Sequence, residues 1–88
     1  MTVASTHTKN PAGGWDISAT TKADSGEKIA RIQVVVNGAS EYDRLFDPPI
    51  GNWQDVITQQ GQYPGSNVVQ VIATSDQGDN TESYDAWN

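Results

Sequence analysis

The segment Ile29–Gly38, IARIQVVVNG, decides the fold class of this 88-residue chain. One face of the segment is apolar at every second position: Ala30, Ile32, Val34 and Val36. Such alternation in a segment rich in β-branched residues predicts a strand with one buried face. Asn37-Gly38 follows at once. Because both residue types tolerate a positive φ, this pair predicts a tight hairpin turn.

The hairpin leads into a returning strand over residues 39–46. We expect Asp47-Pro48-Pro49 to end this strand, because a proline cannot donate to a strand ladder. A second clear strand covers residues 67–75, where one face carries Val69, Val71 and Ala73. A turn predicted at residues 63–66 precedes it. A polar turn at residues 76–80 follows it and leads into a last edge strand over residues 81–87.

The N-terminal part of the chain adds one more strand to this pattern. Trp15, Ile17 and Ala19 alternate with polar residues over positions 15–21, after a loop at positions 11–14. We expect residues 1–13 to be either a flexible segment or an edge strand, and residues 14–88 to form one domain.

The segment 52–60 is compatible with two structures. Trp53, Val56 and Ile57 have the spacing of a helical face, and Asn52 is a suitable helix cap. As a strand, the same segment would place Trp53 and Ile57 on one face with Asp55 between them. We interpret it as a strand, because strands follow one another regularly on both sides of it.

These segments together predict an all-β protein of six to seven short antiparallel strands. Two sheets packed face to face would bury the apolar stripes of residues 30–36 and 69–73 against each other. Trp15, Trp53 and Tyr63 would add bulk to this small core.

The order of the strands and turns resembles the bacterial immunoglobulin-like domains. The segments that carry the resemblance are 29–38, Gly51-Asn52-Trp53, Pro64–Asn67, Val68–Asp76 and Gly78–Thr81. The resemblance covers residues 14–87 and implies an immunoglobulin-like Greek-key β-sandwich that is usually not an enzyme. Members of that family serve as spacers, adhesive modules, or protein- and carbohydrate-binding appendages. It implies an extracellular, surface or virion location. A start at Met1 and an end at Asn88 favour an accessory protein over a spacer.

Composition excludes several classes of function. The chain has 5 Lys and Arg against 11 Asp and Glu, a net charge of −6. We therefore expect no binding to nucleic acid and none to an anionic membrane surface, since both need clustered positive charge. The absence of cysteine excludes disulfides, thiolate catalysis and zinc–thiolate sites. We find neither a signal peptide nor an apolar run long enough to insert into a membrane, and the residues leave localisation open.

Few residues are candidates for chemistry. His7 is the single histidine, and it lies in a Ser/Thr-rich segment that we expect to fray, so no catalytic residue and no cofactor are predicted. Asp76, Asp79 and Asn80 are the one metal candidate, because calcium prefers oxygen ligands. An ordinary turn, in which Asp and Asn bond their own backbone, explains the same residues.

Aromatic residues supply the functional prediction. The chain has 3 Trp and 3 Tyr, more than a core of this size needs. Tyr84 and Trp87 are the predicted partner contacts, together with Pro48 and Pro49. We expect a non-enzymatic interaction or structural accessory module that binds a protein partner or itself. The alternatives are a carbohydrate-binding module that uses exposed Trp and Tyr, and a small hydrolase inhibitor that inserts a rigid loop, Asp47–Ile50.

Overall fold

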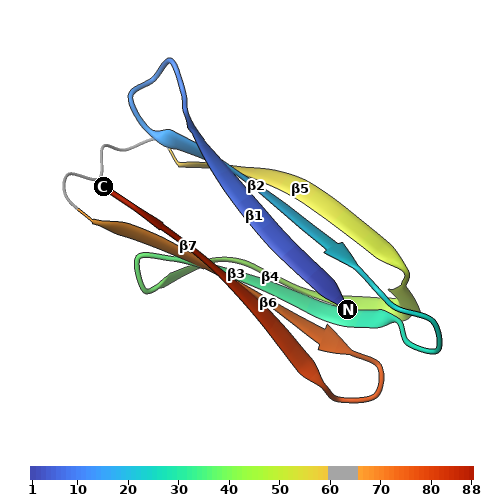
Figure 1. Ribbon diagram of the computed structural model, residues 1–88. Coiled ribbons are helices and arrows are strands. Elements are labelled where there is room, and N and C mark those ends of the chain that lie inside the picture. The colour runs from blue at the N-terminus through green and yellow to red at the C-terminus, as the bar shows by residue number, and fades with distance from the viewer. Residues whose placement is uncertain (60–65) are drawn as a thin grey trace.

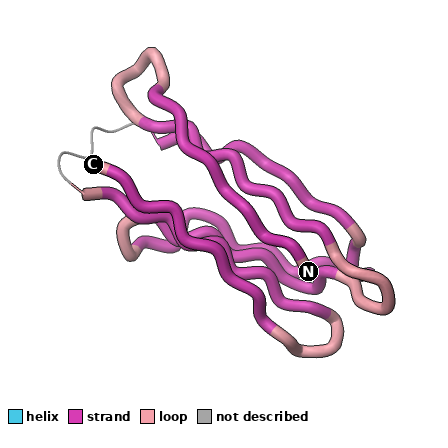
Figure 2. The backbone as a smooth tube through the Cα atoms, in the orientation of Figure 1, coloured by secondary structure: helices cyan, strands magenta, loops and turns pink. Residues whose placement is uncertain are grey.

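The computed structural model describes residues 1–59 and 66–88 (Figures 1 and 2). The described residues form seven strands and no helix, and hence contain no helical segment that could cross a lipid bilayer. The strands are β1 (Thr2–Lys9), β2 (Trp15–Lys22), β3 (Ile29–Val36), β4 (Ala39–Ile50), β5 (Asn52–Gln59), β6 (Asn67–Ser75) and β7 (Asn80–Trp87).

The strands form two antiparallel sheets that lie face to face (Figure 1). One sheet has three strands in the order β1-β2-β5, and the other has four in the order β4-β3-β6-β7. The chain passes between the sheets after β2, after β4 and after β5. This arrangement confirms the predicted all-β sandwich, and the strand interpretation of residues 52–59 is correct. Two predictions lie outside the described residues. The core position of Tyr63 is among residues 60–65, and so is all of the predicted turn at residues 63–66 except Ser66.

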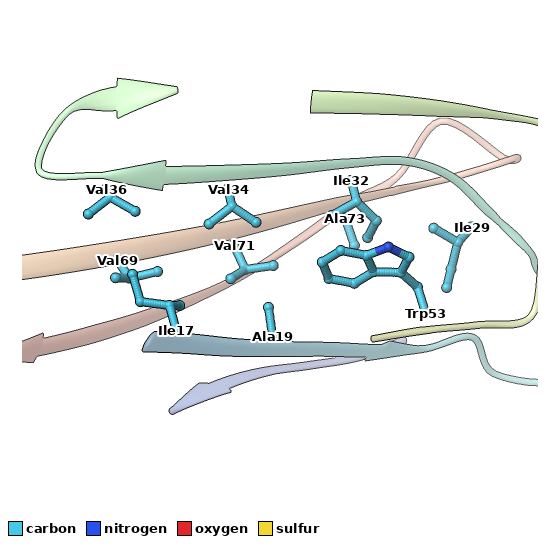
Figure 3. Packing of buried hydrophobic residues seen from close by; sticks show 10 residues of the cluster. All are labelled: Ile17, Ala19, Ile29, Ile32, Val34, Val36, Trp53, Val69, Val71 and Ala73. Carbon is cyan, nitrogen blue, oxygen red and sulfur yellow. The ribbon is translucent and has the colours of Figure 1, made fainter. Parts of the chain in front are cut away.

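The core lies between the two sheets (Figure 3). Val34 of β3 and Val71 of β6 face Ile17 and Ala19 of β2, and all four side chains are buried. Trp53 of β5 closes the same layer from the three-stranded sheet. Both apolar stripes predicted from the sequence are buried, but the prediction that they pack against each other across the gap between the sheets was wrong. β3 and β6 are hydrogen-bonded neighbours in one sheet, so their stripes lie side by side and pack against β2 and β5 of the other sheet. The complete buried apolar set is Ile17, Ala19, Ile29, Ile32, Val34, Val36, Trp53, Val69, Val71 and Ala73.

The prediction was wrong for one residue of the apolar stripe on β3. Ala30 is only half-buried, whereas Ile29 is completely buried. The register of β3 shifts between Ile29 and Arg31 against both of its neighbours, β4 and β6. An extra residue in a strand is left unpaired and bends it, so Ile29 and Ile32 both face the core although they are three positions apart.

The predicted end of β4 was also wrong. The strand continues through Asp47, Pro48 and Pro49 to Ile50, and the peptide bond between Asp47 and Pro48 is cis. The ladder between β3 and β4 jumps from the pair Arg31–Leu45 to the pair Ile29–Ile50. Both prolines fall in this gap, where no hydrogen bond to β3 needs a backbone donor, so the strand can continue through them.

The hairpin between β3 and β4 has the predicted turn. Asn37 and Gly38 both have positive φ, of 50° and 83°, as a two-residue turn of this kind requires. The Asn37 side chain also ties the turn to the start of β6. Its Oδ1 accepts from the Val68 N–H at 2.8 Å, and its Nδ2 donates to Oδ1 of Asn67 at 3.0 Å.

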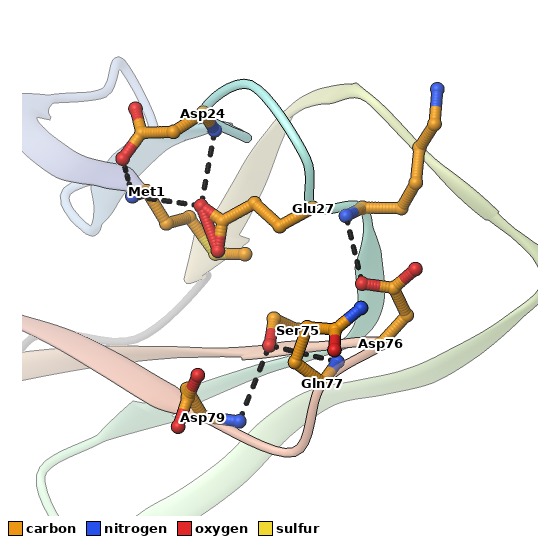
Figure 4. A network of polar contacts seen from close by, with 8 residues as sticks. Met1, Asp24, Glu27, Ser75, Asp76, Gln77 and Asp79 are labelled. Carbon is orange, nitrogen blue, oxygen red and sulfur yellow. Dashed lines mark hydrogen bonds and ion pairs between the residues drawn. The ribbon is translucent and has the colours of Figure 1, made fainter.

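The N-terminal segment forms β1, an edge strand paired along its length with β2. The Met1 ammonium contacts the carboxylates of Asp24 and Glu27, in the loop between β2 and β3 (Figure 4). These contacts raise the pKa of the amino group, chiefly through the hydrogen bond to Asp24. The start of β1 is therefore held at the same end of the sandwich as that loop.

Replacing Ile32 with alanine should lower the free energy of unfolding by about 2–5 kcal/mol, because the change leaves a cavity between the sheets. Ile72→Ala is the matched control, since Ile72 is only half-buried on the outer side of β6, and it should cost less than half as much. Urea denaturation followed by tryptophan fluorescence measures both. Equal losses would contradict the inward placement of Ile32.

Candidate functional site

Tyr84 lies in the middle of β7 and points away from the core, with 65% of its surface exposed. Its neighbours Ser83 and Asp85 point the other way and are half-buried, as the alternation of a strand requires. Among the Trp and Tyr residues in the described part of the chain, Tyr84 is the one that is exposed. The prediction of a surface aromatic residue on β7 thus holds for Tyr84.

The residues around Tyr84 are the outward side chains of the four-stranded sheet. Gln70 pairs with Tyr84 on one side and with Val35 on the other, so these three residues form one row across β7, β6 and β3. Val68 and Ile72 lie two positions before and after Gln70 on the same face of β6. Val68 is 40% exposed. We call this surface the Tyr84 face: Val35, Val68, Gln70, Ile72 and Tyr84.

Two hydrogen bonds hold the Tyr84 phenol in place. Gln70 Nε2 donates to the Tyr84 hydroxyl at 2.8 Å, and the hydroxyl donates to Oε2 of Glu82 at 3.1 Å. The bond to Glu82 raises the pKa of Tyr84, because a phenolate would meet the negative charge of that carboxylate. The ring is therefore exposed and neutral, and the two hydrogen bonds fix its orientation.

Charged side chains border the Tyr84 face toward β4. Arg31 donates to both carboxylate oxygens of Asp43, at 2.9 and 2.7 Å. The guanidinium lowers the pKa of Asp43 below its usual range, so the pair stays ionised. Leu45, which pairs with Arg31 in the ladder, is 74% exposed beside them. The exposed apolar surface is thus bounded by a fixed ion pair.

Trp87, the second predicted contact on β7, lies on the opposite face of the strand from Tyr84. Its ring stacks on the His7 ring at 3.9 Å between centroids and meets the Trp15 ring edge-on at 5.3 Å. The structure therefore does not bring Tyr84 and Trp87 together. The sequence contained the signal, because two residues three positions apart in a strand point to opposite faces.

His7 belongs to a cluster that joins the two sheets, which the sequence analysis missed. It lies on β1, is half-buried, and its Nδ1 lies 2.6 Å from Oδ2 of Asp85 on β7. An ionised carboxylate can only accept, so the Nδ1–H donates. The expectation of a frayed His7 was wrong, because the contacts that hold it come from residues far along the chain. We call His7, Trp15, Asp85 and Trp87 the β1–β7 seam.

Pro48 and Pro49 do not lie on a protruding loop. Pro48 is exposed and Pro49 is half-buried, and both belong to β4. The exposed side of this segment remains available for contact, but it is part of the sheet edge. The structure therefore removes the preformed loop on which the inhibitor alternative depended.

The three calcium candidates take part in hydrogen bonds at and around the turn between β6 and β7. Figure 4 shows those of Asp76 and Asp79. Asp76 Oδ1 accepts from the Lys28 N–H at 3.0 Å, and Asn80 Oδ1 accepts from the Thr74 hydroxyl at 2.7 Å. The Asp79 N–H donates to Ser75 Oγ at 3.2 Å. Within residues 1–59 and 66–88, no three His, Asp or Glu side chains gather in an arrangement that could hold a metal ion.

Comparisons of the chain with protein-family models, with curated proteins and with solved structures find no match.

Replacing Glu82 with glutamine should lower the pKa of Tyr84, because the negative acceptor that stabilises the phenol is lost. In wild type the contact stabilises the fold at neutral pH, and this contribution is lost as the pH rises through the raised pKa of Tyr84. Tyrosinate absorbance, corrected with Tyr84→Phe, measures the titration. Glu41→Gln, on an exposed position of β4, should leave it unchanged. The same result for both glutamine variants would contradict the contact.

His7→Phe should lower the free energy of unfolding by about 1–3 kcal/mol, because it retains a ring against Trp87 but leaves the Asp85 carboxylate without its donor. Thr6→Ala, at the neighbouring exposed position of β1, should change it by no more than about 0.5 kcal/mol. Chemical denaturation at neutral pH tests both variants. A loss at His7 as small as that at Thr6 would show that the seam does not stabilise the sandwich.

Proposed function

We propose that this chain is a non-enzymatic, immunoglobulin-like interaction module that binds a protein partner through the Tyr84 face. The observation that carries the proposal is the Tyr84 ring, which is 65% exposed yet held by hydrogen bonds to Gln70 and Glu82. Tyrosine is among the residues that contribute most to binding at protein interfaces. A side chain that is already ordered loses less conformational entropy on binding, so more of its contact energy appears as affinity.

The surroundings of Tyr84 also suit a protein interface. Val35, Val68 and Ile72 add apolar surface next to the ring, and the ion pair of Arg31 and Asp43 lies toward β4. Protein interfaces typically combine an apolar and aromatic centre with a polar rim. Because the backbone donors and acceptors of β3 and β6 are used within the sheet, contact at this face is made by side chains alone.

The β1–β7 seam offers little support for catalysis. A histidine paired with a carboxylate is part of a nucleophilic triad, and His7 and Asp85 form such a pair. However, the hydroxyls of Ser5 and Ser83, on the inner sides of β1 and β7, are buried and make no hydrogen bond to His7 in the described structure. The pair is therefore more consistent with a structural contact between the sheets.

The carbohydrate-binding alternative has less support. It would use several exposed rings, whereas Trp15, Trp53 and Trp87 are half-buried or buried and Tyr84 is the one exposed Trp or Tyr of the described residues.

The proposal includes an accessory location on a cell surface or particle. This location agrees with the resemblance to bacterial immunoglobulin-like domains.

The test is to use the purified chain as bait in extracts of its source, and to measure binding of the captured protein. Tyr84→Ala should weaken that binding about thirtyfold or more, as expected for an aromatic interface anchor. Tyr84→Phe separates the ring from the hydroxyl and should cost much less.

Two valines provide a matched control. Val68→Ala truncates the Tyr84 face, whereas Val56→Ala truncates an exposed valine on the outer side of the other sheet. The first should weaken binding and the second should not. Equal effects of the two, or no effect of Tyr84→Ala, would place the contact elsewhere. Turnover of model esters, peptides or glycosides by the purified chain would overturn the non-enzymatic part of the proposal.

A further inference from the structure

Among the strands that the structure describes, β5 leaves one long edge of the sandwich open. It pairs with β2 on one side and is the last strand of its sheet on the other (Figure 2). The neighbouring strand of the opposite sheet, β4, does not hydrogen-bond with it. An open edge carries free backbone donors and acceptors, and it is a template for pairing with another chain.

The sequence of β5 makes this edge suitable for pairing. Trp53 and Ile57 lie on its inner side, opposite Thr21 and Ile17 of β2, and Val56 is 55% exposed on its outer side. Apolar and β-branched residues of this kind favour strand association. A regular eight-residue edge with this composition needs some feature that prevents association.

Asp55 occupies the position where that feature is expected. It pairs with Ala19, which is completely buried, so its register position is on the inner side of the sheet between Trp53 and Ile57. The side chain is nevertheless exposed. A carboxylate cannot enter the core without a large desolvation cost, so it turns outward around the open edge of the strand.

The carboxylate also occupies a backbone donor of β5. Asp55 Oδ1 accepts from the Val56 N–H at 2.8 Å. Since this N–H bonds a side chain outside the ladder, it belongs to the open edge. The N–H groups of alternate residues point to the same side of a strand, so those of Gln54 and Thr58 share that edge. Asp55 thus covers the central donor of the edge along which a new strand would pair.

We propose that the open edge of β5 is a latent pairing surface for a second copy of this chain, and that Asp55 keeps it closed. Two copies of β5 joined antiparallel around this point would bring their Asp55 side chains opposite or diagonal to each other. Like charges at such positions oppose strand pairing. Each copy would also have to exchange the bond from the Val56 N–H to Asp55 for one to the incoming strand.

The other edges of the sandwich are protected by different means. β1 and β7 lie beside each other, and the β1–β7 seam joins them (Figure 1). β4 carries Pro48 and Pro49, which have no backbone donors, within a gap in its pairing. Of the edges of the described strands, β5 is therefore the one where a single side chain controls pairing.

The test is the self-association of Asp55→Val, measured by sedimentation equilibrium and light scattering on the whole chain. Wild type should remain a monomer of 9.5 kDa, and Asp55→Val should form a dimer with self-association about tenfold stronger or more. Asp55→Asn removes the charge but keeps an oxygen that can accept from Val56, so it should associate less than Asp55→Val.

Two further variants identify the surface. In the double variant Asp55→Val with Val56→Pro, the proline removes the exposed donor, so the dimer should revert to monomer while circular dichroism remains that of the folded protein. Asp79→Asn neutralises an exposed carboxylate in the β6–β7 turn and should remain monomeric. Dimers that persist with the proline, a folded Asp55→Val that stays monomeric, an Asp55→Asn that associates more strongly than Asp55→Val, or a wild type already paired through β5 would each overturn the proposal.

Discussion

The contact between the apolar stripe of β3 and β6 and that of β2 and β5 is the constraint on which the rest of the structure depends. Val34, Val71 and Ile17 are at most 1% exposed, so this layer excludes water completely. In a small domain, which buries only part of the surface that its unfolded chain exposes, one such layer carries most of the hydrophobic stabilisation. Because side chains alternate along a strand, burying one stripe commits every other residue to the outside.

That alternation also determines what the surface can do. On β7 it separates Tyr84, which faces solvent, from Trp87, which packs in the β1–β7 seam. The sequence presents both as aromatic residues near the C-terminal end, but they contribute to different properties. Trp87 helps to join the two sheets, and its ring is not available to a partner in this arrangement. Tyr84 contributes little to the core, so its exposed ring is available for the proposed recognition role.

Local signals were sufficient for the features that depend on neighbouring residues. The Asn37-Gly38 turn and the alternating strands follow from propensity and periodicity. The local spacing of residues 52–59 also fitted a helix, and their strand structure was predicted only from the regular strands on both sides. Features that depend on residues far apart in the chain could not be predicted from these local signals. The bulge at Ala30 is defined by pairing with two other strands, and His7 is held by Asp85, 78 positions along the chain. Pro48 is a strand residue only because β3 leaves a gap opposite it.

The Tyr84 face and the open edge of β5 differ in how specific a contact each can make. The Tyr84 face is mostly apolar and lies over the paired strands β3, β6 and β7, so the proposed partner would have to match its side chains. The open edge of β5 offers backbone groups that any extended chain could pair with, and there a carboxylate, Asp55, covers the central donor. The proposed binding role needs this asymmetry, because contact through backbone groups carries little sequence information. Burying the negative charge of Asp55 would destabilise the fold. The charge is tolerated because the side chain reaches solvent at the edge of the strand.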